Sequence, residues 1–153
     1  MTPASPPRCS VPLLRPGSLR RGVDVIDMVT ATTPLVAFEA QRLGVMGAVI
    51  SASHNPFGDN GIKLFAPGGT KLPDDVEAQI ETALDVLGDP SNSIGRIGVH
   101  HDTTHYVKHV LDMLGGRDLS GMKVVLDTAN GAGTTVAPDV LRASGAEVIV
   151  IAN

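Results

Sequence analysis

The chain has 153 residues, of which 42% are hydrophobic, 18% are charged and only 3% are aromatic. This length allows one modest domain or parts of two, with a core built from Val, Ile, Leu and Ala side chains. The net charge of −4 argues against a nucleic-acid-binding surface, and no apolar stretch approaches the length that spans a membrane. The single cysteine, Cys9, excludes an internal disulfide and fits a reducing compartment, so we expect a cytoplasmic protein.

The first 17 residues differ in composition from the rest of the chain. They contain five prolines and no acidic residue. Because proline lacks a backbone donor and fixes φ, such a density of prolines disfavours both a helix and a central strand. We therefore predict a disordered, proline-rich head over residues 1–17.

Residues 18–116 alternate between apolar strand patterns and amphipathic helix patterns. Pro34 suits the first turn of a helix, and Gly44 suits its end. The segment from 88 to 98 is rich in glycine and is expected to be a loop. The patterns predict strands at 23–29, 47–52 and 61–66, and helices at about 34–43, 73–87 and 105–114.

A second unit is expected over residues 119–153. The pattern predicts a strand at 123–127, a glycine-rich turn at 130–133, a helix at 134–144 and a strand at 147–151. A strand, a crossover helix and a second strand form a βαβ unit, in which the two strands are parallel. The predicted fold class is therefore α/β: a mixed sheet flanked by helices, followed by the first βαβ unit of a second, similar domain.

One loop carries most of the chemical signal. Ser51-Ala52-Ser53-His54-Asn55-Pro56 directly follows an apolar strand, and the next strand carries Lys63. A serine hydroxyl can carry a phosphoryl group, an imidazole can move a proton, and an ammonium group can stabilise negative charge. This combination of side chains at a strand end favours phosphoryl transfer.

The same residues also have plainer interpretations. Ser51 and Ser53 are two residues apart, so both can face the same way in an extended segment, and serines before Asn-Pro commonly form turns. A lone loop histidine such as His54 usually orients a loop, and a lysine on a strand is usually solvated. Asn55 and Asn60 are expected to shape the loop more than to contact a substrate.

His101, His105 and His109 recur at a spacing that puts them on one helix face. An apolar face lies opposite them, so we expect these histidines to point to solvent. Zinc sites need three or four ligands in a closed arrangement, and no carboxylates accompany these histidines in the pattern. We therefore do not predict a metal site there.

The serine loop and two other segments closely resemble the α-D-phosphohexomutase family. The resemblance covers the chain from about residue 18 to its end. Among the family's branches, the motifs are most similar to the branch that interconverts glucosamine 6-phosphate and glucosamine 1-phosphate. The segments that carry the resemblance are 51–56 with its continuation 59–63, then 68–72 and 126–133.

The resemblance implies a mechanism and a set of site residues. Ser53 would carry a phosphoryl group, give it to a hexosamine monophosphate and receive the other phosphate of the resulting bisphosphate. The catalytic residues would be Ser53, His54 and Lys63, the substrate-binding residues Ser53, Asn55 and Lys63, and Mg²⁺ would bind through the phosphate on Ser53. The product would lead to UDP-N-acetylglucosamine. Neither a nucleic acid nor a membrane is implied as a partner, and the oligomeric state stays open.

The chain also departs from the family's pattern. The family's first strand and its arginine-bearing loop should precede Ser18, and the proline-rich head does not match them. The family's aspartate-rich metal loop is expected beyond Asn153. We therefore expect a mutase fragment, with most of domain I at 18–116 and the start of domain II at 119–153, that is inactive alone. The alternatives are a fragment from the mannose- or glucose-phosphate branches, or a non-catalytic sugar-phosphate-binding remnant.

Overall fold

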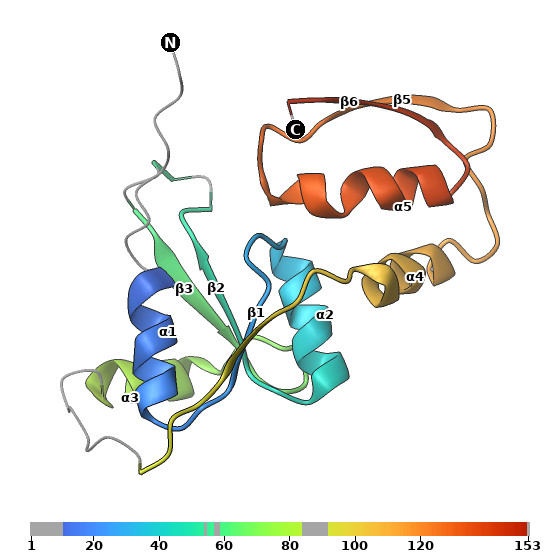
Figure 1. Cartoon of the computed structure of the whole chain (residues 1–153). Helices are drawn as coiled ribbons and strands as arrows, with labels where there is room; N and C mark the ends of the chain where they lie inside the picture. The colour runs from blue at the N-terminus through green and yellow to red at the C-terminus, as the bar shows by residue number, and fades with distance from the viewer. Residues whose placement is uncertain (1–10, 54, 57–58, 84–91, 153) are drawn as a thin grey trace.

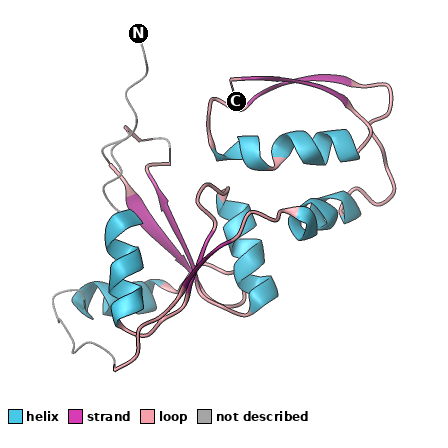
Figure 2. Ribbon diagram, viewed as in Figure 1, coloured by secondary structure: helices cyan, strands magenta, loops and turns pink. Residues whose placement is uncertain are grey.

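The computed structural model describes residues 11–53, 55–56, 59–83 and 92–152, and it is an assembly of short helices and two-stranded sheets (Figures 1 and 2). Among these residues, no helix combines the length and hydrophobicity needed to cross a lipid bilayer. In chain order the elements are α1 (Val11–Arg20), β1 (Val25–Asp27), α2 (Thr33–Leu43), β2 (Gly47–Ser51), β3 (Gly61–Phe65), α3 (Asp74–Ala83), β4 (Ile97–Val99), α4 (Thr104–Asp112), β5 (Lys123–Asp127), the 3₁₀ helix η1 (Ala132–Thr135), α5 (Ala137–Ala143) and β6 (Glu147–Ile151).

The predicted α/β class is confirmed, since both parallel and antiparallel strand pairs are present with helices beside them. Among the described residues the strands form three separate pairs: β1 with β4 and β5 with β6 are parallel, and β2 with β3 is antiparallel. In the first part of the chain, the strands expected to form one mixed sheet are found among the described residues as two separate sheets, one parallel and one antiparallel. In Figure 1, these two pairs and α1 to α3 lie together, whereas β5, β6, α4 and α5 form a second group.

Helix α2 has the start and end that its sequence predicts. The Thr32 hydroxyl accepts the Leu35 N–H at 3.4 Å, Pro34 lies in the first turn, and Gly44 closes the helix with φ 65°. These features satisfy backbone groups that a helix leaves unpaired at its ends. Leu35 is only 1% exposed, so this helix supplies the most deeply buried large side chain of the described core.

The β2–β3 hairpin packs against α2. Gly47 lies so close to α2 that an added Cβ would stand 3.2 Å from both the Ala40 Cβ and a Val36 methyl. Val49, two residues further along the same face, is 8% exposed. A glycine at the point of closest approach therefore allows the helix to lie directly on the strand.

Strand β4 begins inside the segment 88–98, which we expected to be a loop, so that expectation was wrong for residues 97 and 98. The strand exists because β1 supplies its hydrogen-bonding partner, with Ile26 opposite Gly98. Gly95 precedes it at a tight crossing where an added Cβ would overlap the Val23 carbonyl oxygen. The glycines nearby favour a loop, and the strand forms only because it pairs with β1, 72 residues earlier in the chain.

Helix α1 overlaps the segment expected to be disordered, so the expectation was wrong for residues 11–17, while residues 1–10 lie outside the described residues. Pro12 stands in the first turn, where a missing N–H removes no helical hydrogen bond. Pro16 removes one. The Leu19 carbonyl accepts the Gly95 N–H at 2.9 Å, and this long-range bond ties the end of the helix to the segment before β4.

The expected βαβ unit at the C-terminal end is confirmed. Strands β5 and β6 have the predicted bounds and pair in parallel, from Lys123 opposite Glu147 to Asp127 opposite Ile151. The predicted helix is divided into η1 and α5. Pro138 stands in the first turn of α5, where proline favours a helix start and so separates it from the preceding 3₁₀ turn.

The turn after β3 gives the first testable prediction, because it contains adjacent glycines in different settings. Gly69 has φ 75°, and an added Cβ would overlap the Ala37 carbonyl oxygen, whereas a Cβ at Gly68 would have nothing within 4 Å. We expect Gly69→Ala to lower the free energy of unfolding by about 1–2 kcal/mol or more, since a left-handed alanine costs roughly that amount before any overlap. Gly68→Ala, the matched control, should change it by less than about 0.5 kcal/mol. Urea titration followed by circular dichroism measures both, and equal effects would contradict this description of the turn.

Candidate active site

The hairpin register fixes where the serine loop begins and ends. Strand β2 ends at Ser51, which pairs with Gly61 at the start of β3, and Val49 pairs with Lys63. Residues opposite each other in an antiparallel pair share a face, as do alternate residues of one strand. Ser51 and Lys63 are therefore diagonal neighbours on one face of the hairpin. Helix α2 covers the same face at Gly47, the first residue of β2.

Ser53 adopts a backbone conformation that is uncommon for a residue with a side chain. Its φ is 56°, and its N–H donates to the Ser51 Oγ at 2.9 Å. Left-handed conformations at non-glycine residues persist when neighbouring groups hold them, and they occur often at functional sites. Ser53 is exposed, so a group on its Oγ is accessible from solvent.

The remaining expected site residues have mixed outcomes. Lys63 is exposed on β3, and Asn55 is exposed and donates its N–H to the Ala52 carbonyl at 2.9 Å, which closes a second turn that spans Ser53. His54 lies outside the described residues. The structure thus places Ser51 and Ser53 at one end of the hairpin, with Lys63 two residues further along β3 from Gly61, the partner of Ser51. Asn55 takes part in the loop turn through its backbone N–H.

The same strand-end turn occurs twice more, and the sequence analysis missed it. The Asp27 Oδ1 accepts the N–H of Val29 at 2.9 Å, and the Asp127 Oδ1 accepts that of Ala129 at 2.8 Å. Val29 and Ala129 have φ values of 57° and 49°. In all three cases the last strand residue accepts from the residue two positions on. A polar residue directly after an apolar run was the available signal, because Asp and Ser side chains bond the backbone two residues later.

A charged cluster around a buried carboxylate was also missed. Glu39 is 3% exposed; its carboxylate accepts two bonds from the Arg42 Nε at 3.0 Å and one from Nη2 at 2.6 Å. The hydrogen bond from Arg42 to Glu39 raises the pKa of the guanidinium further above its ordinary value. The His100 Nε2 stands 3.9 Å from Glu39. Glu39 follows buried Leu35 by four residues, and that helical spacing was the signal for its burial.

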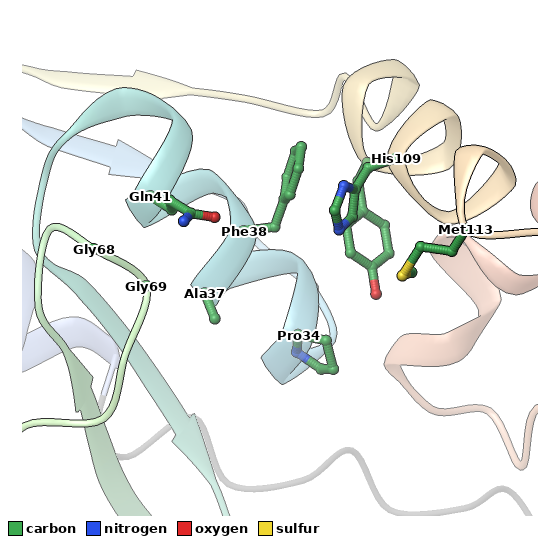
Figure 3. A pocket seen from close by; sticks show the side chains of 9 residues that line it. Pro34, Ala37, Phe38, Gln41, Gly68, Gly69, His109 and Met113 are labelled. Atoms are coloured by element: carbon green, nitrogen blue, oxygen red, sulfur yellow. The ribbon is translucent and has the colours of Figure 1, made fainter.

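A shallow hollow of about 310 Å³ lies between α2, α4 and the glycine turn after β3 (Figure 3). Phe38 of α2 faces His109 of α4 there, with 4.9 Å between ring centroids, and Tyr106 meets Phe38 edge to face at 5.4 Å. His109 therefore packs against a ring, and the expectation that it points only to solvent was wrong. This aromatic contact joins α4 to α2.

Two further observations concern metal binding. Within residues 11–53, 55–56, 59–83 and 92–152, no group of three or more His, Cys, Asp or Glu side chains could hold a metal ion. Magnesium prefers oxygen ligands in near-octahedral array, and Ser53 alone does not provide them. The described residues do not by themselves fit a magnesium ion.

A model of a known protein family matches the part of the chain that contains the hairpin. The model for the α/β/α domain I of phosphoglucomutase/phosphomannomutase matches residues 13–89, which include the whole hairpin and the serine loop.

Similar relatives share a name. Phosphoglucosamine mutase of Corynebacterium aurimucosum is 48% identical over 143 residues, covering 90% of this chain and 32% of the relative. Its counterpart in Bifidobacterium animalis subsp. lactis is 48% identical over 147 residues, and that of Thermobifida fusca 45% over 141, with 90% of this chain and 32% and 31% of the relatives covered. The chain thus spans about a third of the length of the curated relatives it matches.

The pair between buried Glu39 and partly exposed Arg42 gives the second prediction. Arg42→Met should lower the urea midpoint, because it leaves a carboxylate buried without its bidentate partner. The double variant Glu39→Met/Arg42→Met should have a higher midpoint than Arg42→Met alone, since it removes the charge together with its partner. Lys108→Met removes the exposed pair with Asp112 and serves as the control, with little expected change. A double variant less stable than Arg42→Met would show that Glu39 has another strong partner.

Proposed function

Because the chain belongs to the phosphoglucomutase/phosphomannomutase family, we propose that it supplies the phosphoryl-carrying serine of a mutase that interconverts glucosamine 6-phosphate and glucosamine 1-phosphate. The shared name of its relatives, phosphoglucosamine mutase, supports this choice of sugar. Residues 18–116 correspond to most of the first domain and residues 119–153 to the start of the second. A cytoplasmic location is part of the proposal, supported by the single cysteine.

The observation that carries the proposal is the setting of Ser53. This residue is exposed at the carboxyl end of β2, its backbone is held by the Ser51 hydroxyl, and Lys63 lies on the adjacent strand. A phosphoryl carrier needs an accessible hydroxyl at a fixed position, with positive charge near the group that moves. Phosphoryl transfer depends mainly on such positioning and electrostatics.

The proposed step moves one phosphoryl group. The bond between the phosphorus and the Ser53 Oγ breaks as a hydroxyl oxygen of the sugar monophosphate forms a bond to that phosphorus. The proton of the sugar hydroxyl ends on the Ser53 Oγ, so serine and a sugar bisphosphate result. The reverse step, from the other phosphate of the bisphosphate, restores phosphoserine and releases the isomeric monophosphate.

Three neighbouring side chains have proposed roles in this step. Lys63 stabilises the negative charge of the transferring group, and His54 shuttles the proton. Asn55 contributes a contact to the substrate. The family's magnesium ion would bind the phosphate on Ser53 and neutralise charge there. Since the described residues do not fit that ion by themselves, its other ligands would come from elsewhere in the enzyme.

The third prediction tests Ser53 in a complete enzyme. A chimaera is made in which this chain replaces the matching third of the Corynebacterium aurimucosum relative. With Mg²⁺ and a sugar bisphosphate as the first phosphoryl donor, it should convert glucosamine 6-phosphate in a coupled assay. Ser53→Ala should lower kcat by on the order of 10³-fold or more, because it removes the hydroxyl that carries the phosphoryl group.

Ser93→Ala is the matched control, since Ser93 is an exposed serine in the segment before β4. It should leave kcat within about twofold of the parent. An inactive parent chimaera would count against the function, and so would a Ser53→Ala variant that retains the parent's rate. A preference for mannose or glucose phosphates over glucosamine phosphates would assign the chain to another branch of the family.

A further inference from the structure

The Ser51 hydroxyl is in direct contact with the backbone of the proposed phosphoryl carrier. Its Oγ accepts the Ser53 N–H at 2.9 Å, and Ser53 has φ 56°. We propose that Ser51 is a positioning residue of the phosphoryl-transfer site, which holds the Ser53 backbone while adding no negative charge beside the phosphate. This inference rests on the proposed function, because it requires that Ser53 carry the phosphoryl group.

Ser51 is itself held firmly, which makes it a suitable anchor. It is the last residue of β2, it pairs with Gly61, and it is half-buried. A second bond spans Ser53, because the Asn55 N–H donates to the Ala52 carbonyl at 2.9 Å. Ser53 therefore lies in two overlapping turns, and its left-handed backbone needs such support because a residue with a Cβ disfavours it.

The two other strand-end turns show what is specific to Ser51. At those positions the acceptor is a carboxylate, from Asp27 and Asp127, and the residues two positions on have the same left-handed backbone. A carboxylate is therefore compatible with this turn. At β2 the acceptor is an uncharged hydroxyl instead. The difference matters if Ser53 is phosphorylated, because a phosphoserine carries a charge of about −1.5 to −2.

A carboxylate at position 51 would stand two residues from that phosphate and would repel it. The same repulsion would act on an incoming sugar phosphate. The positive charge of Lys63 lies on the same face of the hairpin, diagonal to Ser51, and Gly61 places no side chain between them. A carboxylate at position 51 would also compete with the phosphate for that ammonium group. Both effects favour a neutral acceptor at this strand end.

Four substitutions separate the anchoring role from the charge requirement. They are made in the same chimaera and compared by kcat and KM. Ser51→Thr keeps a neutral hydroxyl and should stay within about threefold of the parent. Ser51→Ala removes the acceptor and should lower kcat by about tenfold with little change in KM. Ser51→Asn and Ser51→Asp form the matched pair, because both keep a side-chain oxygen for the turn and they differ only in charge.

The pair gives the decisive comparison. Ser51→Asp should have a kcat about a hundredfold below that of Ser51→Asn, because like charges at this separation repel strongly in a partly excluded site. The ratio between the two should shrink as KCl is raised from 50 to 500 mM, since salt screens exposed charges. Thermal melting of all four variants within a few degrees of one another would show that the turn itself survives.

Each other outcome overturns the inference. Equal rates for Ser51→Asn and Ser51→Asp would mean that charge at this position is irrelevant and that the turn is only structural. A Ser51→Ala variant with the parent's rate would mean that the hydrogen bond does not position Ser53. The two proposals fail separately: if Ser53→Ala retains activity, the proposed function is wrong, whereas an inactive Ser53→Ala with no difference among the Ser51 variants removes only the role of Ser51.

Discussion

The packing of α2 on the β2–β3 hairpin is the contact on which the candidate site depends. Gly47 allows the helix to approach β2 closely at Val36 and Ala40, and Val49 on the same strand face is buried. This packing fixes the start of β2, and the hairpin register then fixes its end at Ser51. The position of the serine loop therefore follows from apolar packing at the start of the same strand, a few residues before the loop.

At that end of β2, a single side-chain hydrogen bond connects the strand to the loop. The residue that ends the strand accepts the N–H of the residue two positions later, and this donor residue has the left-handed backbone. Because Asp27 and Asp127 form the same turn, the device belongs to the strand ends of this fold rather than to the chemistry. What distinguishes β2 is the neutral acceptor and the exposed serine that it orients.

Much of this arrangement was predictable, and the exceptions have physical reasons. Strands β5 and β6 match their predicted bounds because their apolar runs are flanked by clear turn residues. β4 was missed because it forms through pairing with β1, a contact between residues far apart in sequence that no local pattern records. α1 was missed because its end is tied to Gly95 by a similar long-range bond, which outweighs the two prolines.

The candidate site, too, has parts that the sequence predicts and parts that depend on contacts in the folded chain. Ser53 and Lys63 stand out by residue type and by the loop that separates them, and both are exposed where a substrate can reach them. The part played by Ser51 was not predictable from alternation along a strand, because its hydroxyl turns to the backbone after the strand ends. Glu39 was missed because a charged residue in an amphipathic helix ordinarily faces water, whereas here Arg42 compensates its burial.

The central claim is that Ser53, held by Ser51, carries the phosphoryl group. The most direct test is the site of phosphorylation in the chimaera after incubation with a hexose 1,6-bisphosphate. Trypsin cleavage after Arg42 and Lys63 releases one peptide that contains both Ser51 and Ser53, because no lysine or arginine lies between these cleavage sites. Fragmentation of this peptide in a mass spectrometer should place the phosphate on Ser53. A phosphate on Ser51, or an unmodified peptide from an enzyme that turns over, would contradict the account.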